Sequence, residues 1–275
     1  MSATRLLRTA SVIALALIFF LPLWWVTVSA LRPEEDIFRY LSPLSIWTLW
    51  PRDATLEHVI ALWTGPFAGA IFNTIYVTFV TVVVGLALSA MAGFALAAMR
   101  FRFRESLFLI IVVSFLIPFD AIALPLFGIM REVHLQNTYT GIILPGIGNG
   151  LAVFLLRQFF LGIPKELREA ALIDGMSWFG IFWRVYLPLS RPALISAALI
   201  LFVFQWQAYL WPLIIAPAPD YKVAAVAIAQ FSDLYGVSYG LIFSAAFFVS
   251  VIPMVILVVF QQYFTASVAS SAGKG

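Results

Sequence analysis

Residues 169–192 have the sequence EAALIDGMSWFGIFWRVYLPLSRP, a charged and glycine-containing segment in a chain that is otherwise strongly apolar. The chain of 275 residues is 63% hydrophobic and 11% charged, and it contains 26 Phe and 9 Trp. Soluble globular domains are usually about half apolar and about a quarter charged. Because helices satisfy their own backbone hydrogen bonds inside a bilayer, this composition predicts an all-α polytopic membrane protein.

Six segments are long and apolar enough to cross about 30 Å of hydrocarbon. We therefore predict six transmembrane helices, at about residues 11–31, 70–99, 106–130, 139–160, 193–215 and 241–263. The first is interpreted as a retained helix, because its apolar run is longer than the roughly 7–15 residues of a cleaved signal peptide. The expected organisation is a first helix with an outer loop over 1–69, followed by a core of five transmembrane helices over 70–275.

An even number of spans places both chain ends on one side of the membrane. If that side is the cytoplasm, eleven of the 16 Lys and Arg residues lie inside, as the positive-inside rule favours. The other five lie outside: Arg32, Arg39, Arg52, Arg131 and Lys222. Residues 169–192 are then expected to face the cytoplasm, and the net charge of +3 reflects topology and not nucleic-acid binding.

The segment at about residues 164–188 is predicted to form two short helices joined by a turn. Pro164 suits the start of the first helix, and Gly175 suits the left-handed position after its end. Ser177 is predicted to cap the second helix, which should end before Pro188 because a proline disfavours helical conformation in the residue before it. Apolar residues recur at helical spacing on this second helix, at Trp178, Phe182, Val185 and Leu189.

The residues alone leave two kinds of partner open for this helix pair. An amphipathic pair lying among lipid headgroups would use the same aromatic side chains. The acidic residues Glu166, Glu169 and Asp174 are disfavoured there, because anionic lipids repel them. A protein that presents basic groups would accommodate these carboxylates better.

The spacing of this segment resembles the EAA motif in permease subunits of bacterial ABC importers, with Val185 where the family pattern has Ile. The resemblance implies a coupling helix that docks on a separate ATPase subunit. Glu169 would pair with a basic group of the ATPase, and Gly175 would permit the turn. The coupling residues implied are Glu169, Ala170, Ala171, Asp174, Gly175, Leu187 and Pro188.

Other segments are similar to the carbohydrate-uptake branch of these permeases, in particular to its MalG-like subunits. They include HLQNT at 134–138, FLLRQFF at 154–160, IPKEL at 163–167 and WPL at 211–213. The resemblance implies the MetI-like fold of type I importer permeases and a sugar or sugar-like solute. Two departures are Trp206-Gln207-Ala208, where the branch often has Trp-Asn-Asp, and the tail SVASSAGKG at 267–275.

The same resemblance implies an assembly in a bacterial cell membrane. Its members would be a second permease subunit in a heterodimer with this chain, two copies of an ABC ATPase, and an extracytoplasmic solute-binding protein. ATP and Mg²⁺ would be bound by the ATPase. No cofactor is expected in this chain.

Motifs for catalysis are absent from the sequence. No G-x-x-x-x-G-K-[ST] element is present, and the glycines of PGIGNG at 145–150 are interpreted as close helix packing or a local break in a span. The chain has no Cys, and its two His residues stand alone, so we expect no disulfide, metal site or catalytic triad. We expect a non-enzyme. The alternatives are an ion-gradient-coupled secondary transporter, disfavoured by the few intramembrane charges, and a membrane scaffold.

Polar residues within the predicted spans are candidates for a solute path, because their burial in hydrocarbon is costly. Structural roles are at least as probable for each of them, as acceptors for freed backbone amides or in contacts between helices. Gln205 and Gln207 point about 200° apart on a regular helix, so only one should face a path unless Pro212 distorts the segment. The candidates are Asn73, Asp120, Asn149, Gln205, Gln207 and Tyr209.

Overall fold

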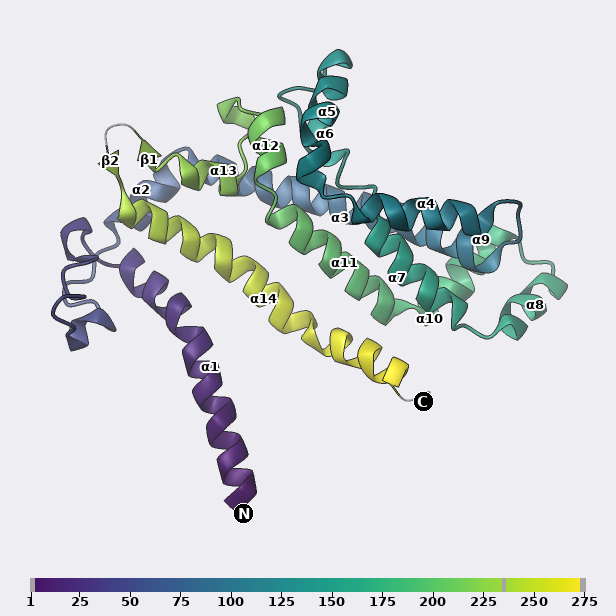
Figure 1. Cartoon of the computed structure of the whole chain (residues 1–275), viewed down its shortest axis with the longest axis horizontal. Helices are drawn as coiled ribbons and strands as arrows, with labels where there is room; N and C mark the ends of the chain where they lie inside the picture. The colour runs from purple at the N-terminus through teal and green to yellow at the C-terminus, as the bar shows by residue number, and fades with distance from the viewer. Residues whose placement is uncertain (1–2, 234–235, 273–275) are drawn as a thin grey trace. The chain divides into compact units, whose positions relative to one another are not determined.

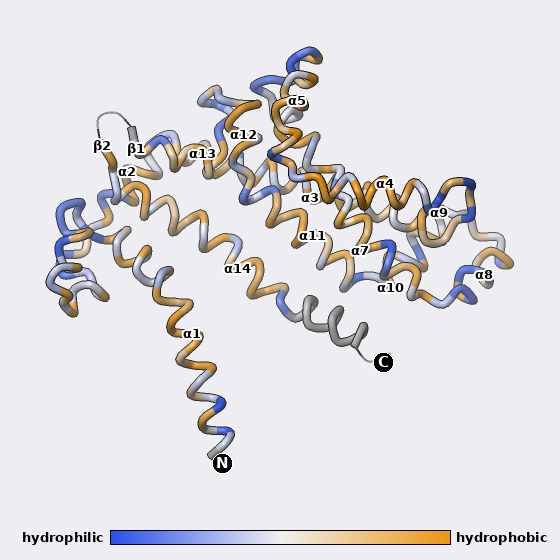
Figure 2. Tube along the Cα trace, viewed as in Figure 1, coloured by the Kyte–Doolittle hydropathy of each residue, from blue (hydrophilic) through white to orange (hydrophobic). Residues whose placement is uncertain are grey.

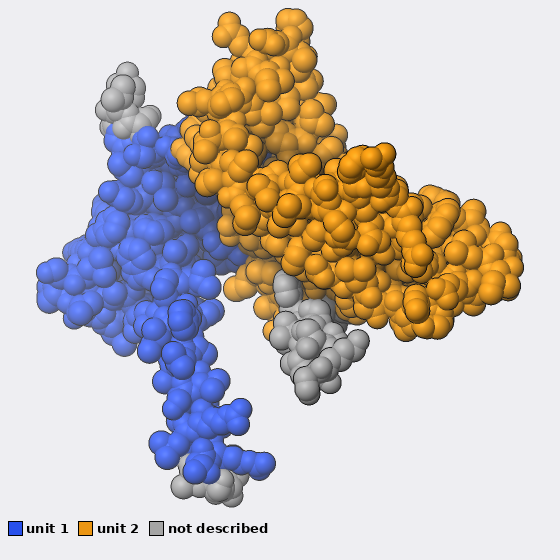
Figure 3. Space-filling view, turned by 45° about the vertical axis from the view of Figure 1, so that its right-hand side comes forward, with its two compact units in different colours: residues 1–71, 223–252 blue, residues 72–222, 253–275 orange. Residues whose placement is uncertain are grey.

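The computed structural model describes residues 3–233 and 236–272, which form helices and one short β-hairpin (Figure 1). The all-α class is confirmed. Residues 1–71 and 223–252 form one compact unit, unit 1, and residues 72–222 and 253–275 form a second, unit 2 (Figure 3). The first boundary lies close to the predicted division at residue 69, but unit 1 also includes residues 223–252, which are distant in sequence.

Unit 1 surrounds a small apolar core made by Leu62, Phe67, Ile71, Ala224 and Ala245. It contains the beginning of α3 and residues 239–252 of α14. Its elements in chain order are α1 (Ala3–Ala30), the 3-10 helices η1 (Glu34–Asp36) and η2 (Ile46–Thr48), α2 (Glu57–Thr64), α3 (Phe67–Ala98), α13 (Ala224–Ala229), β1 (Ser232–Asp233), β2 (Gly236–Val237) and α14 (Tyr239–Ala272).

The loop after α1 is organised around the buried guanidinium of Arg32, which is only 1% exposed. Its Nη2 donates to the backbone oxygens of Trp47, of Thr48 at 2.9 Å and of Trp50 at 3.4 Å. Burial lowers the pKa of Arg32, and the nearby carboxylate of Asp36 opposes this shift. One cation therefore holds together a loop that has little regular secondary structure.

Unit 2 holds most of the chain, and both regions of functional interest lie in it. It takes α3 from residue 72 and α14 from residue 253. Its other elements are α4 (Arg104–Leu116), α5 (Phe119–Glu132), α6 (Tyr139–Ile143), α7 (Gly150–Leu161), α8 (Lys165–Ile173), α9 (Trp178–Ile181), the π-helical turn η3 (Phe182–Tyr186), α10 (Leu187–Leu189), α11 (Arg191–Trp206), α12 (Leu210–Ile215) and the 3-10 turn η4 (Pro219–Tyr221).

Three of the six predicted spans are continuous in the described part of the chain. By length and composition, helical residues 7–30, 67–98 and 239–261 are each able to cross a membrane. The other three predicted spans are interrupted, and the interruption between α6 and α7 coincides with PGIGNG at 145–150, where the sequence left a local break open. Segment 106–130 is divided into α4 and α5, which meet at 101°; segment 139–160 contains α6 and α7; and segment 193–215 contains α11 and α12.

Proline and glycine account for these interruptions. Ile117 has an extended backbone with ψ of 122°, the conformation that Pro118 imposes on the residue before it, so α4 ends there. Between α6 and α7, Pro145 lacks a backbone donor, and Gly146 packs where a Cβ would lie 2.5 Å from Oε1 of Gln205. Composition identifies apolar segments long enough to cross a membrane, but it does not show whether the helix within them is continuous.

The distribution of hydropathy separates α8 from the helices around it. Figure 2 shows hydrophobic residues along α1 and α11, whereas α8 is largely hydrophilic. Only Ala171 of the nine residues of α8 is buried. This helix is therefore the exposed polar element that the charged segment predicted.

Unit 2 has an aromatic core at the end of α3. The ring of Phe94 lies 5.2 Å from that of Phe182 and 4.8 Å from that of Tyr186, between ring centroids. Phe160 of α7 packs on the same cluster, 5.6 Å from Tyr186. Aromatic pairs at such distances add about 0.5–1.5 kcal/mol each beyond area burial, so α3, α7 and η3 are held as one body.

A glycine allows α7 to begin against α4. A Cβ at Gly150 would lie 2.8 Å from the backbone oxygen of Ile111 and 2.9 Å from the Cβ of Phe115. Real Cβ atoms almost never come so close to other heavy atoms, and a backbone oxygen has no rotamer through which to yield. The start of α7 therefore requires glycine.

We expect Gly150→Ala to destabilise the protein by about 1–3 kcal/mol, because the added methyl group overpacks the α4–α7 contact. Thermal unfolding of the detergent-purified protein measures the effect. Gly128→Ala on α5 is the matched control, because a Cβ there meets no atom within 4 Å and alanine favours a helix. Equal unfolding temperatures for the two variants would contradict the close packing.

Candidate functional site

The first helix of the predicted coupling segment is confirmed. Pro164 precedes α8, and α8 is followed by Gly175 in left-handed conformation with φ of +76°. Ser177 caps the next helix, since its hydroxyl oxygen accepts the Gly180 N–H at 3.2 Å. The turn thus rests on one residue that tolerates positive φ and one residue that satisfies a free amide.

The sequence predicted that the second helix ends before Pro188, and this prediction is wrong. After α9 it widens into the π-helical turn η3 and continues through Pro188 in α10. A proline ring normally clashes with the carbonyl four residues earlier, here that of Arg184, and the wider turn relieves this clash. The bend comes later, at Ser190, between this helix and α11.

The residues that match the EAA motif divide into an exposed and a buried group. Glu169, Ala170, Asp174, Gly175 and Pro188 are exposed, whereas Ala171 is buried against the aromatic core and Leu187 is half-buried. The buried positions attach the segment to unit 2. The exposed positions leave a surface that is free to meet another molecule.

Large apolar side chains accompany this exposed surface, and the sequence analysis missed them. Ile173 is 86% exposed, and Phe179 and Trp183 stack on one another with ring centroids 6.3 Å apart while both stay largely exposed. Of the apolar face that was predicted, Phe182 is buried instead. In the rest of that face Val185 is half-buried, whereas Trp178 and Leu189 are exposed. The predicted series therefore lies only partly inward, and Phe179 and Trp183 lie on the exposed side.

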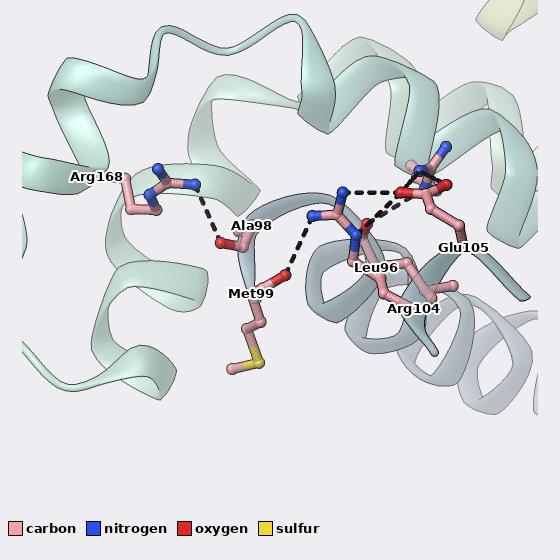
Figure 4. Close-up of polar contacts among 7 residues, drawn as sticks. Leu96, Ala98, Met99, Arg104, Glu105 and Arg168 are labelled. Atoms are coloured by element: carbon pink, nitrogen blue, oxygen red, sulfur yellow. Dashed lines mark hydrogen bonds and ion pairs between the residues drawn. The ribbon is translucent and has the colours of Figure 1, made fainter. Parts of the chain in front are cut away.

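Three arginines from three different helices converge on the end of α3 (Figure 4). The last carbonyl groups of a helix lack partners within the helix and carry partial negative charge, which favours cations. Each arginine donates to one such oxygen: Arg157 of α7 to Leu96 at 3.2 Å, Arg168 of α8 to Ala98 at 3.0 Å, and Arg104 of α4 to Met99 at 3.2 Å.

Glu105 joins two of these arginines. Nη2 of Arg157 donates to both carboxylate oxygens of Glu105, at 3.0 and 2.8 Å, and Arg104 donates to the same carboxylate at 2.7 Å. The guanidinium of Arg157 also lies 3.9 Å from the centre of the Phe108 ring. We call Arg104, Arg157, Arg168 and Glu105 the arginine cluster. It connects α3, α4, α7 and α8.

The carboxylate of Glu169 lies 3.7 Å from Arg168, but this contact is weak. The two residues are adjacent in sequence, and the Glu169 side chain is 55% exposed. Exposed ion pairs of this kind contribute about 0–1 kcal/mol. Glu169 is therefore available to a second cation, whereas Arg168 is already bound to the end of α3.

A pocket of about 890 Å³ opens elsewhere in unit 2, within the size range of small-molecule sites. It is enclosed by α3, α4, α5, the α6–α7 connection, α11 and α12. The predicted residues Asp120, Asn149, Gln205, Gln207 and Tyr209 all line it, together with Thr81 and Ser114. The broken spans bring these side chains together, because each break ends a helix at the pocket.

Both glutamines line the pocket, although a regular helix would point them apart. Gln205 is the second-last residue of α11, and Gln207 lies just beyond its end at Trp206. The chain leaves the helical path at this point, so Gln207 no longer follows the helical repeat. The sequence allowed both glutamines to face one path only if Pro212 distorts the helix. The helix ends before Pro212, at Trp206.

Asn73 lies outside this pocket and serves the fold. Its Nδ2 donates to the backbone oxygens of Asp220 at 2.8 Å and Lys222 at 2.9 Å, and its Oδ1 accepts the hydroxyl of Tyr139 at 2.8 Å. These three hydrogen bonds tie η4 and the start of α6 to α3. The Asn73 amide therefore has the structural role that the sequence left open beside a role in the solute path.

Comparison with known proteins identifies the architecture. Residues 85–270 match the family model described as the binding-protein-dependent transport system inner membrane component. The chain belongs to this family. The matched range contains the EAA segment, the arginine cluster and five of the six candidate solute-path residues, all except Asn73.

Individual relatives align with nearly the whole chain. The chain is 35% identical to the arabinooligosaccharides transport system permease protein AraQ of Halalkalibacterium halodurans, over 95% of this chain and 93% of the relative. It is 28% identical to the sn-glycerol-3-phosphate transport system permease protein UgpE of Yersinia pestis, over 94% of each. A crystal structure of a bacterial ABC transporter involved in the import of the acidic polysaccharide alginate matches with a TM-score of 0.79 at 25% identity, over 96% of this chain and 99% of that one.

These similarities settle the class of the protein. It is a multi-pass membrane permease of the ABC importer type with the MetI-like fold, and a transport subunit and not an enzyme. A binding-protein-dependent system also implies partner subunits. The ion-gradient-coupled transporter and the scaffold that the sequence left as alternatives have no support from this family.

We expect Arg157→Met to destabilise the permease by about 2 kcal/mol, because the change removes charge-assisted hydrogen bonds made by a buried guanidinium while conserving much of its volume. Thermal unfolding in detergent measures the loss. The matched control is Arg100→Met, which changes an exposed arginine close to the end of α3. If the two variants unfold at the same temperature, the arginine cluster does not hold these helices together.

Proposed function

We propose that this chain is one half of the membrane domain of an ATP-driven importer for a sugar or sugar-like solute. Its partners in this proposal are a second permease subunit, two copies of an ABC ATPase and an extracytoplasmic solute-binding protein. ATP and Mg²⁺ are bound by the ATPase. The observation that carries the proposal is α8, an exposed polar helix with the EAA spacing that is fastened to the membrane helices by one arginine.

The exposed surface of α8 and α9 is the docking site for the ATPase. Its coupling residues are Glu169, Ala170, Ala171, Asp174, Gly175, Leu187 and Pro188, of which Glu169 pairs with a basic group of the ATPase. The exposed apolar side chains of Ile173, Phe179 and Trp183 supply contact area beside it. Apolar anchors with a charged neighbour are typical of specific protein interfaces.

Movement of α8 is transmitted through the arginine cluster. Arg168 connects α8 to the end of α3, where Arg104 and Arg157 connect the same end to α4 and α7. Closure of the ATPase pair on ATP would displace α8, and the connected helices would follow as rigid bodies. Because α3, α4 and α7 also line the pocket, this displacement changes the solute path.

The pocket of unit 2 forms this chain's share of the solute path. The relatives named for arabinooligosaccharides and sn-glycerol-3-phosphate support a polyhydroxylated solute. Amide groups of Asn149, Gln205 and Gln207 offer both donors and acceptors to hydroxyl groups, and Tyr209 and Trp211 offer aromatic faces. Both chain termini lie in the cytoplasm with α8, in agreement with the excess of Lys and Arg on that side.

Glu169→Lys is expected to lower ATP-dependent uptake at least about tenfold, because it places like charges against the proposed basic group of the ATPase. Uptake is measured in proteoliposomes that contain the complete importer. Co-purification of the ATPase with the tagged permease reports docking directly. Glu132→Lys reverses an exposed carboxylate outside the EAA segment and is the matched control, with uptake expected near that of the wild type. Wild-type uptake by Glu169→Lys contradicts the docking role.

Gly175 allows a second test that separates backbone conformation from size. Left-handed conformation costs L-residues about 1–2 kcal/mol, and asparagine tolerates it better than alanine. A Cβ at Gly175 meets no atom within 4 Å, so no clash confuses the comparison. We expect Gly175→Asn to retain more ATP-dependent uptake than Gly175→Ala, at equal amounts of inserted protein. The reverse order would show that the turn does not control coupling.

A further inference from the structure

The pocket of unit 2 contains one formal charge, and that charge is negative. Asp120 lines it, and the structure describes every lining residue, among which there is no Lys, Arg or His. The remaining lining is made of amide, hydroxyl, aromatic and aliphatic side chains. A solute that carried a carboxylate or a phosphate would meet a like charge here and no counter-charge.

Helix ends at the pocket strengthen this bias. The C-terminal ends of α4 and α11 reach it, through Ser114 and Phe115 on the first helix and Gln205 on the second. The C-terminal end of a helix carries partial negative charge. The ends of these two helices therefore lie beside the pocket, where they disfavour an anion.

The two longer helices that begin at the pocket do not compensate. A helix N-terminus is the usual backbone site for an anion, and α5, α7 and the six-residue α12 begin here. The first turn of α5 already carries Asp120. The N-terminus of α7 is capped by Asn149, whose Oδ1 accepts the Ala152 N–H at 3.0 Å. The start of α5 thus carries a like charge and the start of α7 is occupied by an oxygen of the chain itself, whereas α12 has no side-chain cap.

We propose that this pocket selects uncharged polyhydroxylated solutes, such as neutral oligosaccharides, and rejects sugar phosphates and uronic-acid oligosaccharides. The inference rests on the proposed function, in which the pocket is part of the solute path. Asn149, Gln205 and Gln207 hydrogen-bond hydroxyl groups, and the rings of Phe204, Tyr209 and Trp211 cover the C–H faces of sugar rings.

Direct binding to the complete permease–ATPase complex in detergent, without the binding protein, tests the selection. Saturation-transfer NMR compares three probes at equal concentration: arabinotriose, maltotriose and trigalacturonate. We expect signals from at least one of the two neutral trisaccharides and at least about tenfold weaker signals from trigalacturonate. Binding of trigalacturonate as strong as that of the neutral probes would overturn the inference, as would the absence of neutral binding.

A pair of variants assigns the selection to the pocket. Asp120→Asn removes the carboxylate and is expected to raise the trigalacturonate signal several-fold. Glu132→Gln removes an exposed carboxylate at the other end of the same helix, outside the pocket, and is expected to leave that signal unchanged. An equal response of the two variants would show that Asp120 does not exclude anions.

Uptake in proteoliposomes with the binding protein distinguishes failure of this inference from failure of the proposed function. If no saccharide is taken up with ATP, the proposed function fails and the inference falls with it. If ATP-dependent saccharide uptake is present but the charge selection is absent from the pocket, only the inference fails.

Discussion

The unpaired carbonyl groups at the end of α3 are the constraint on which the rest of unit 2 depends. Leu96, Ala98 and Met99 present their oxygens where no further helical turn supplies donors. Arginines from α4, α7 and α8 supply them, and Glu105 neutralises part of the positive charge thus gathered. The helices α4 and α7 and the exposed helix α8 are therefore attached to one point, the end of α3, close in sequence to Phe94 of the aromatic core.

This arrangement gives the permease a physical route between its two functional regions. The helices that meet at the arginine cluster also reach the pocket. Thr81 of α3, Ser114 and Phe115 of α4, and Asn149 directly before α7 line it. Packed helices move as rigid bodies and do not deform continuously. A displacement of α8 by an ATPase would accordingly reach the pocket without any flexible intermediate, while Gly175 confines the change of direction to one residue.

The sequence predicted the membrane class, the apolar segments, α8 and the turn at Gly175, because composition and local backbone preference act over short distances. It left the continuity of the spans open. Pro118 and Pro145 were visible, but a proline inside an apolar run is compatible with either a kink or a break. The arginine cluster was missed for a related reason: Arg157 and Glu105 are 52 residues apart, and nothing local indicates that they pair.

The sequence and the tertiary structure therefore determine different features of this protein. The sequence by itself determined that the chain lives in a membrane, that one polar segment projects from it, and that this segment has the EAA spacing, since hydrophobicity and helix signals are properties of neighbouring residues. Only the tertiary structure decided which polar residues share a pocket and which, like Asn73, serve the fold. The breaks in α4–α5, α6–α7 and α11–α12 bring together side chains from distant positions, and that meeting depends on how the helices pack.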